Sequence, residues 1–394
     1  MANHKILLKP GKEQSVKRLH PWVFSGAIKS SCQDIHEGDV VDVYSADNKF
    51  LATGHYQIGS IAVRILSFEQ VNIDIDFWKM RIQLAYNFRK DSGLTDDPIT
   101  NVYRLINAEG DGLPGLIADY YNGTIVLQIH SIGIFHARDH LAEAFRHVLD
   151  SRLKAVYDKS ELTIPFKSGL RTKNSYIYGH PESNVVIENG LKFSVDWEHG
   201  QKTGFFIDQR DNRKLILKYS DNRKVLNLFG YTGAFSVYAI QGRASKVVTI
   251  DSSKQALELA KINVNLNFDD TSQCEFINND VFDYLNNSMN TFDLVIVDPP
   301  AFAKHQNVLN NALQAYKRIN AKVIEQINPG GIIFTFSCSQ VVSKEDFQRA
   351  IFVAAANTGR TVRVLHKLTQ PADHPFSIYH PEGEYLKGLV LHVE

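Results

Sequence analysis

The chain has 394 residues, and at about 100–200 residues per domain it is expected to fold as two to four domains. Hydrophobic residues make up 44% and charged residues 22%, a globular composition that excludes collagen-like, disordered and membrane-embedded classes. Lys plus Arg and Asp plus Glu each number 43, so the zero net charge excludes a globally basic chain but allows a local basic patch.

Cysteine content and the N-terminal stretch bear on the compartment. Cys32, Cys274 and Cys338 are too few and too scattered for a disulfide framework or a zinc site, and no metal is predicted. The opening MANHKILLKPGKEQ lacks an apolar segment with a cleavage site, and no run of about 18 apolar residues occurs. We therefore expect a cytoplasmic protein without a membrane partner.

The first expected domain covers residues 1–72. Its short β-rich segments Val40–Tyr44, Phe50–His55 and Ile61–Leu66 are separated by turn residues, which predicts a small barrel. Residues 1–29 carry six Lys or Arg against one acid, a local surplus of five positive charges. This surplus favours RNA binding, and an ordinary solvated face is the alternative.

A central mixed α/β domain is expected over residues 73–180. A charged helix from Phe77 to Lys90, a strand at Thr124–His130 and an amphipathic helix near Phe135–Leu149 indicate this unit.

From about residue 181 to residue 394 the pattern changes to apolar runs that alternate with helical stretches. The strand candidates are Val225–Phe229, Lys246–Ile250, Phe292–Val297, Gly331–Ser337 and Gly388–Val393. Continuous apolar strands between helices are typical of a doubly wound, Rossmann-like parallel sheet. Such sheets bind ligands beyond the carboxyl ends of their strands, so we expect the catalytic site here.

A glycine-containing turn follows the first of these strands. Gly230 and Gly233 allow close approach of a ligand to the backbone, although a strand-to-helix turn without a ligand is the alternative. Asp251 ends the next strand, 21 residues after Gly230. A carboxylate at this spacing accepts hydrogen bonds from ribose hydroxyls, so the pair indicates an adenosine-bearing cofactor.

The missing motifs narrow the choice of cofactor. Neither G-x-G-x-x-G for a pyrophosphate nor G-x-x-x-x-G-K-[ST] for ATP is present, which favours S-adenosylmethionine. Asp280 is then placed to meet the adenine amine, with Val281 and Phe282 as apolar neighbours. A helix N-cap is the alternative role of Asp280.

Two further strand ends carry reactive side chains. Asp298 follows the apolar run Phe292–Val297 and precedes Pro299 and Pro300, and partial burial there would raise the pKa of its carboxyl. Cys338 ends the strand Gly331–Ser337. A thiolate adding to carbon 6 of cytosine turns the ring into an enamine whose carbon 5 can attack a sulfonium methyl group, and a protonated Asp298 would stabilise the charge at N3. Cys32 and Cys274 lack such placement and are expected to be structural.

The order of these motifs resembles a known family. Leu226–Gly233, Asp251, Asp298–Pro300 and Phe336–Ser339 are similar to the ribosomal RNA large subunit methyltransferase I family, which methylates carbon 5 of a cytosine. The resemblance covers the whole chain and implies an N-terminal PUA domain, a central α/β domain and a C-terminal S-adenosylmethionine domain. Arg18–Gly26, Asn107–Gly115 and Gly200–Arg210 resemble further family blocks.

The resemblance implies a cofactor site and an RNA partner. The segment Lys202–Arg210 should border the cofactor, and the basic residues within 201–224 would face RNA unless Asn212–Ser220 is only a surface helix. The expected partner is 23S rRNA or a large-subunit assembly intermediate, and homodimerisation is left open. The expected cofactor-binding residues are Phe206, Gln209, Arg210, Asn227, Phe229, Gly230, Thr232, Gly233, Asp251, Ser252, Asp280, Val281 and Asp298.

One departure leaves a role unassigned. RNA cytosine-5 enzymes with two cysteines carry one directly after the Pro-Pro pair, where this chain has Ala301, so the base that removes the carbon 5 proton is not identified. His374 is a candidate, although a lone histidine is more often structural. Two alternative functions stand beside the leading hypothesis: methylation of an exocyclic base amine, and a ribosome-associated RNA-binding protein with a degenerate transferase domain.

Overall fold

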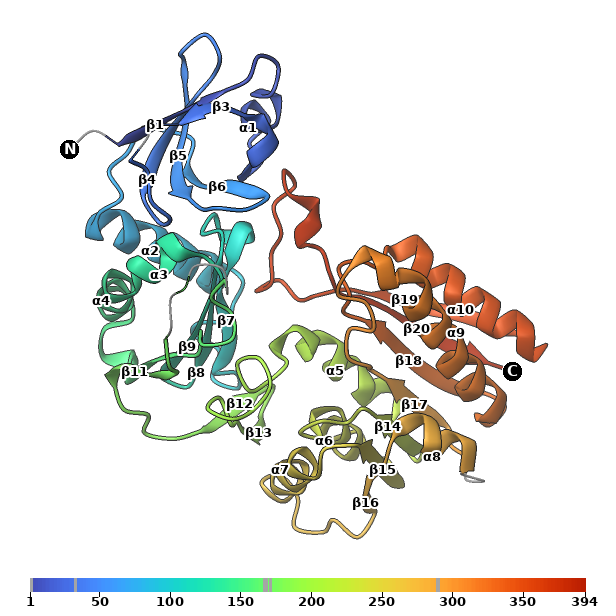
Figure 1. Cartoon of the computed structure of the whole chain (residues 1–394). Helices are drawn as coiled ribbons and strands as arrows, with labels where there is room; N and C mark the ends of the chain where they lie inside the picture. Colours follow the sequence, from blue (N-terminus) through green and yellow to red (C-terminus); the bar gives the residue numbers. More distant parts are fainter. Residues whose placement is uncertain (1–2, 32–33, 166–168, 170–171, 288–290) are drawn as a thin grey trace. The chain divides into compact units, whose positions relative to one another are not determined.

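The computed structural model describes residues 3–31, 34–165, 169, 172–287 and 291–394, so Cys32 lies outside the described residues. The chain forms two compact units. The first contains residues 1–187, 195–207 and 372–383, and the second contains residues 188–194, 208–371 and 384–394. Figure 1 shows the elements of both units. No helix in the described ranges combines the length and hydropathy that crossing a bilayer requires.

A six-stranded sheet with strand order β2-β6-β5-β4-β1-β3 opens the first unit. Its strands are β1 (His4–Leu8), β2 (Trp22–Phe24), β3 (Ile28–Ser31), β4 (Val40–Tyr44), β5 (Phe50–Tyr56) and β6 (Ile61–Ser67), and the short helix α1 (Gln14–Lys17) precedes β2. The pairs are antiparallel except β1 with β4, which is parallel. Alternating apolar residues, among them Ile6, Leu8, Val41, Val43 and Val63, point into one buried core.

A five-stranded sheet follows in the same unit, with strand order β11-β10-β9-β8-β7. Its strands are β7 (Val102–Asn107), β8 (Leu116–Tyr121), β9 (Thr124–Ile129), β10 (Ala155–Asp158) and β11 (Ser175–Gly179). The helices α2 (Ile75–Asp91), α3 (Ile132–His136) and α4 (Arg138–Leu149) pack against it (Figure 1). Helix α2 begins earlier than the sequence predicts because the Asp74 carboxylate accepts hydrogen bonds from two backbone N–H groups of its first turn.

Strands β12 (Val185–Glu188) and β13 (Leu191–Ser194) form a two-stranded sheet. The chain enters the second unit at Glu188, returns to the first over residues 195–207 and enters the second again at Asp208. The second unit is built on a seven-stranded sheet with strand order β16-β15-β14-β17-β18-β20-β19. Its strands are β14 (Lys224–Leu228), β15 (Lys246–Asp251), β16 (Cys274–Asn278), β17 (Leu294–Val297), β18 (Gly331–Ser337), β19 (Val362–Leu368) and β20 (Lys387–Val393).

Helices cover both faces of this sheet. Helices α5 (Arg210–Ile216), α6 (Ala234–Gln241) and α7 (Lys254–Asn265) lie on one face, and α8 (Val281–Asn287), α9 (Leu309–Gln326) and α10 (Lys344–Thr358) lie on the other (Figure 1). The three-layer arrangement confirms the predicted Rossmann-like class, because apolar strands such as β17 and β18 are buried on both sides.

The sheet departs from the sequence prediction in two respects. It is not wholly parallel, because β20, predicted at Gly388–Val393, pairs antiparallel with both β18 and β19. Two strands, β16 and β19, have no counterpart among the predicted ones. Both are edge strands in which no residue is buried, and both lack the continuous apolar run that marks the central strands.

A buried ion pair fastens α5 within the second unit. The Arg213 guanidinium donates to both carboxylate oxygens of Glu188 at 2.8 and 2.6 Å, and the Tyr238 hydroxyl donates to one of them at 3.0 Å. Arg213 and Glu188 are both almost fully buried. Removing one partner of such a pair leaves an uncompensated buried charge.

We therefore predict that Arg213→Ala lowers the free energy of unfolding by about 3–5 kcal/mol in urea denaturation. Arg243→Ala is the matched control, because Arg243 pairs with Asp221 on the surface and both side chains are mostly exposed. The control should lose no more than about 1 kcal/mol. Equal losses in the two variants would contradict this account.

Candidate active site

The carboxyl ends of four neighbouring strands collect most of the predicted site residues. Strands β15, β14, β17 and β18 lie side by side and parallel, and Leu228 is level with both Ile250 and Val297. The turn after β14, Asp251, Asp298 and Cys338 therefore emerge at the same edge of the sheet. We call this group of residues the strand-end site. The chain order reverses at β14, which is where doubly wound sheets bind ligands.

The turn after β14 has an unusual backbone. Phe229 and Tyr231 have positive φ angles of 57° and 44°, and Gly233 has a φ of 74°. A Cβ atom on Gly230 would lie 2.3 Å from the Thr249 methyl group, so only glycine fits there. Non-glycine residues in this region are strained, and such strain concentrates at functional sites.

The Asp251 carboxylate holds this turn in place. One oxygen accepts a hydrogen bond from the Tyr231 backbone N–H at 2.8 Å, and the other accepts one from the Ser253 N–H at 2.8 Å. Each carboxylate oxygen can accept a second donor, so ribose hydroxyls could still bind. Ser252, beside it, is exposed.

Asn227, on β14, carries an unsatisfied buried acceptor. Its Nδ2 donates to the Ser236 hydroxyl at 2.9 Å, and its buried Oδ1 has no hydrogen-bond partner among the described residues. An ammonium group, such as that of the methionine end of S-adenosylmethionine, would satisfy this oxygen. Thr232 is buried in the same turn, and its carbonyl accepts from Asn263 at 2.9 Å.

Asp280 has the capping role that the sequence left as an alternative. Its Oδ1 accepts hydrogen bonds from the backbone N–H groups of Phe282 and Asp283 at 2.8 and 3.1 Å, at the start of α8. Because Asp280 is exposed, its carboxylate can also meet an adenine amine. Val281 is buried in the core of the second unit.

Asp298 lies directly after β17 in a setting that favours its protonated form. It keeps some solvent exposure but is enclosed by protein on most sides, and this burial, with the nearby negative charge of Asp208, raises the pKa of its carboxyl to about 7. The Gln209 amide donates to it at 3.1 Å and opposes that rise.

Cys338 follows β18 and points toward the residues after β17. Its thiol lies 3.9 Å from the Pro299 carbonyl oxygen and keeps partial exposure. Burial and then the charge of Asp298 raise the pKa of the thiol to about 12, so the free enzyme holds it protonated at neutral pH.

Asp208, Tyr385 and Lys387 lie near these groups and were not predicted from the sequence. Asp208 accepts a hydrogen bond from the Tyr385 hydroxyl at 2.8 Å, while its other carboxylate oxygen is buried without a partner among the described residues. Lys387 is buried, and its ammonium donates to the carbonyls of Ser339 and Val342, which follow Cys338. Lys387 therefore fixes the loop that carries the thiol, and its charge opposes the rise of the thiol's pKa.

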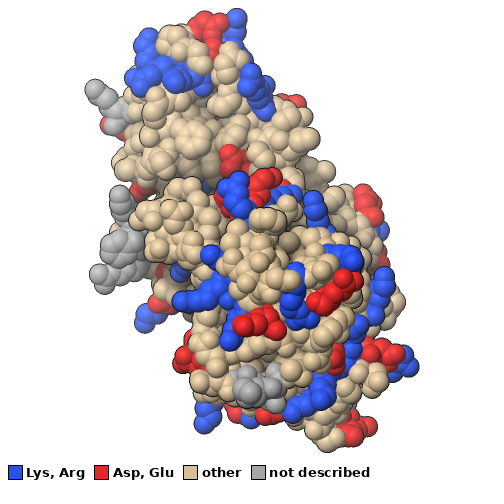
Figure 2. All heavy atoms as spheres, turned by 90° about the vertical axis from the view of Figure 1, so that its right-hand side faces the viewer, with Lys and Arg blue, Asp and Glu red and all other residues tan. Residues whose placement is uncertain are grey.

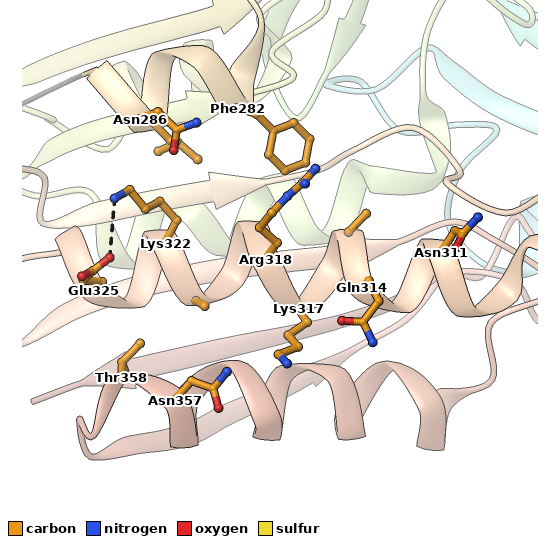
Figure 3. Close-up of a pocket in the computed structure, with 13 residues that line it drawn as sticks. Phe282, Asn286, Asn311, Gln314, Lys317, Arg318, Lys322, Glu325, Asn357 and Thr358 are labelled. Atoms are coloured by element: carbon orange, nitrogen blue, oxygen red, sulfur yellow. Dashed lines mark ion pairs between the residues drawn. The ribbon is translucent and has the colours of Figure 1, made fainter.

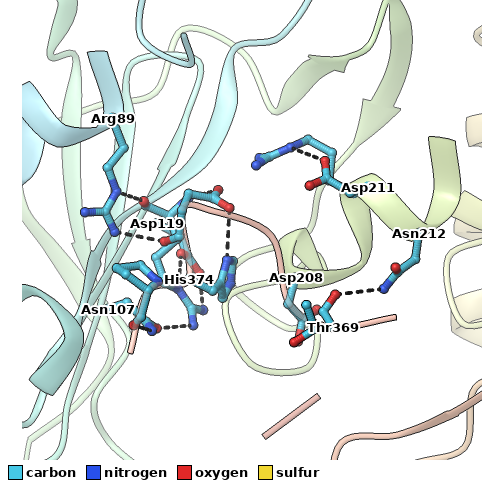
Figure 4. Close-up of polar contacts among 12 residues, drawn as sticks. Arg89, Asn107, Asp119, Asp208, Asp211, Asn212, Thr369 and His374 are labelled. Carbon is cyan, nitrogen blue, oxygen red and sulfur yellow. Dashed lines mark hydrogen bonds and ion pairs between the residues drawn. The ribbon is translucent and has the colours of Figure 1, made fainter. Parts of the chain in front are cut away.

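The segment Lys202–Arg210, expected to border the cofactor, belongs in part to each of the two units. Phe206 belongs to the first unit, and Gln209 and Arg210 belong to the second. Arg210 is buried, with its Nε 3.8 Å from the Asp211 carboxylate. Asn212 donates to Gln209 at 2.7 Å. It also donates toward the Thr369 carbonyl at 3.4 Å (Figure 4).

The segment 201–224, whose basic residues were expected to face RNA, is partly buried, and Asn212–Ser220 is not a surface helix throughout. Asn212, Arg213 and Ile216 are buried, and Arg213 is neutralised by Glu188. The positive surplus therefore overstates the charge that this segment can offer to phosphates.

His374 is held inside the first unit. It is 1% exposed, and its Nδ1 lies 3.1 Å from the Asp373 carboxylate, within a polar network that also includes Arg89 (Figure 4). These contacts favour the structural role that the sequence gave as the more frequent one.

A groove of about 880 Å³ lies elsewhere on the second unit, over α8, α9 and α10. Figure 3 shows Lys317, Arg318 and Lys322 along α9, with Phe282 beside Arg318. Phe282, expected as an apolar neighbour of the adenine, lines this groove, but none of the residues predicted to be catalytic or to contact the cofactor does. The groove is therefore distinct from the strand-end site.

Comparisons with known proteins agree with this arrangement. Residues 112–377 match the family described as S-adenosylmethionine-dependent methyltransferase, and residues 6–68 match a PUA-like domain. A protein from Aeromonas hydrophila subsp. hydrophila, named ribosomal RNA large subunit methyltransferase I, is 40% identical over 98% of each chain. The protein of that name from Vibrio cholerae serotype O1 is 41% identical over 98% of this chain and 99% of its own.

A solved structure, described as a methyltransferase complexed with SAH, shares the fold. It has a TM-score of 0.85 and 25% identity, over 99% of this chain and 100% of that chain. Fold, strand-end site and family match together define an S-adenosylmethionine-dependent methyltransferase with a PUA-like N-terminal domain. Within that class, the chain belongs to the ribosomal RNA large subunit methyltransferase I family.

Asp208 provides a test of the site's electrostatics. Because its charge helps to raise the pKa of Asp298, Asp208→Asn should lower that pKa and leave less Asp298 protonated at pH 7. Titration of the aspartate carboxyl carbons by NMR measures the change. Asp211→Asn, at a mostly exposed side chain, is the control and should leave the pKa of Asp298 in place. An unchanged titration in the Asp208 variant would refute the coupling.

Proposed function

We propose that this methyltransferase transfers a methyl group from S-adenosylmethionine to carbon 5 of a cytosine in 23S rRNA, through a transient bond between the Cys338 sulfur and carbon 6 of the base. The observation that carries the proposal is the pairing of Cys338 with Asp298 on neighbouring strand ends, at the edge that also carries the Phe229–Gly233 turn. The names of the relatives support large-subunit rRNA as the substrate.

The pair Cys338 and Asp298 can carry the chemistry with one shared proton. When the thiol proton passes to the Asp298 carboxylate, the sulfur adds to carbon 6 and the protonated carboxyl donates to N3 of the ring. The bound cofactor supplies the methyl group that carbon 5 takes up. A base then removes the carbon 5 proton, the sulfur leaves carbon 6, and the N3 proton returns through Asp298 to the sulfur. These steps restore the aromatic ring and the free thiol.

The PUA-like sheet offers a surface for the RNA backbone. Lys9, Lys12, Lys17, Arg18 and Lys29 are exposed there, and Figure 2 shows Lys and Arg side chains gathered at the top of the view, over this sheet. Phosphate contacts of this kind supply affinity without reading sequence, so the target cytosine would be selected by entry of the flipped base between Asp298 and Cys338. Phe302, which packs on Tyr316 with ring centroids 4.8 Å apart, could stack on that base.

Methylation of an exocyclic amine is the second candidate. It uses Asp298-Pro-Pro-Ala-Phe302 as a relative of an Asp-Pro-Pro-aromatic motif, but the aromatic residue is displaced by one position. That reaction needs no thiol, so it gives no role to Cys338.

The division into domains 1–72, 73–180 and 181–394 is part of this proposal, supported by the three separate large sheets. A large-subunit assembly intermediate as substrate, a cytoplasmic location and a homodimer stay predictions.

The first test removes the thiol. Cys338→Ala should reduce transfer to rRNA by more than about a thousandfold, since it deletes the nucleophile, while calorimetric titration shows unchanged binding of S-adenosylmethionine. Cys274→Ala is the matched control and should keep its activity, because Cys274 starts the edge strand β16, outside the strand-end site. Nucleoside analysis that finds 5-methylcytosine at a normal rate with the Cys338 variant would exclude the mechanism.

The second test uses pH. Methyl transfer needs the form of the enzyme in which Asp298 and Cys338 together hold one proton. The carboxyl has a pKa of about 7 and the thiol a pKa of about 12, so this form predominates between these pH values. The kcat/KM should therefore rise about tenfold per pH unit below pH 7 and then level off. In Asp298→Asn the amide can donate at any pH, so the rate depends on thiolate alone and should keep rising above pH 7. If the kcat/KM of this variant still levels off at pH 7, the titrating group is not Asp298 and this part of the mechanism is wrong.

A further inference from the structure

Three potential metal ligands meet in the first unit, apart from the strand-end site. His20 follows α1, while His380 and Glu382 lie in residues 372–383. The Nε2 atoms of His20 and His380 lie 3.9 and 3.8 Å from the Glu382 carboxylate oxygens. One donor atom from each of the three side chains lies within 4.8 Å of the other two.

His380 is the unusual member of this cluster. Its side chain is only 4% exposed, and neither ring nitrogen has a hydrogen-bond partner among the described residues. The imidazole packs against Trp22 with ring centroids 4.4 Å apart and against His20 at 5.5 Å. A buried polar group without a partner is costly, so a ligand that accepts a nitrogen lone pair would stabilise this ring.

The carboxylates around His380 have different partners. Glu382 lies within 3.9 Å of the Nε2 atoms of both His20 and His380. Glu109 itself accepts a hydrogen bond from the Trp22 indole N–H at 2.9 Å, which leaves Glu382 as the carboxylate that joins the two imidazoles.

The donor set matches a divalent transition metal. Two imidazoles and one carboxylate, with a position left for water, are ligands that zinc takes at bond lengths of about 2.0–2.2 Å. Tetrahedral ligands at those lengths lie roughly 3.3 Å apart, so each Glu–His separation must shorten by about half an ångström. The Glu382 side chain is 56% exposed and the His20 side chain 17%, so the Glu382 carboxylate can move toward the two imidazoles. The His20 Nδ1 accepts a hydrogen bond from the Trp22 backbone N–H at 3.2 Å, and this bond must break for Nε2 to offer its lone pair to a metal.

We propose that His20, His380 and Glu382 bind one zinc-class divalent cation that joins the PUA-like domain to residues 372–383. These residues lie between β19 and β20 in the sequence, and β20 carries Lys387, which holds the loop after Cys338. The cation would therefore fasten to the PUA-like domain a segment that is continuous with the catalytic sheet. The site does not depend on the identity of the methylated base.

Metal binding itself is the test, on the full chain without a histidine tag. After treatment with a chelator, calorimetric titration with Zn²⁺ should show one ion bound per chain, and cobalt should give the visible absorption of a site with nitrogen ligands. Saturating Zn²⁺ should also raise the thermal midpoint, because it binds the folded state.

Three variants remove one ligand each: His20→Gln, Glu382→Gln and His380→Gln. Each should weaken Zn²⁺ binding at least a hundredfold and abolish the thermal shift, and circular dichroism checks folding. His20→Gln, at a partly exposed side chain, and Glu382→Gln, at an exposed one, keep the test valid if the His380 variant does not fold. His36→Gln is the control, because His36 is 83% exposed beside Asp39 and should bind Zn²⁺ as the unaltered chain does. Failure to bind one ion per chain, or unchanged binding by the His20 and Glu382 variants, would overturn the proposal.

Discussion

The register of the parallel strands β14, β17 and β18 is the constraint on which the site depends. Because these strands end at one edge, residues more than a hundred positions apart along the chain, from Phe229 to Cys338, emerge on the same side of the sheet. The hydrogen bonds of Asp251 to the backbone of the β14 turn hold that turn in a strained conformation. Without this alignment, neither the thiol nor the carboxyl would have a partner.

Burial of these strand ends also raises the pKa of Asp298 and of Cys338. A carboxyl and a thiol share a poorly solvated region, so each keeps its proton to a higher pH than it would in water. The charge of Asp208 raises both pKa values further. The hydrogen bond from Gln209 lowers the pKa of Asp298, and the charge of Lys387 lowers the pKa of Cys338. At neutral pH the thiol is therefore protonated, while the carboxyl is near the midpoint of its titration.

Residues that are marked by their neighbours in the chain could be predicted from the sequence. Asp298 and Cys338 each follow an apolar run of strand length, and the glycines of the β14 turn are adjacent in the chain. The groups that tertiary packing supplies were not predicted: Asp208 meets Tyr385 across 177 positions, and Arg213 is neutralised by Glu188. The edge strands β16 and β19 were missed because exposed polar residues interrupt their apolar pattern.

The central claim is a covalent bond between sulfur and carbon 6, and a trapped adduct tests it most directly. In RNA that carries 5-fluorocytidine at the target position, the carbon 5 substituent cannot leave as a proton, so the adduct should accumulate after methyl transfer. The account predicts one covalent protein–RNA complex whose digestion maps the linkage to Cys338. Methylation that proceeds with no such complex, or a linkage at another residue, would contradict it.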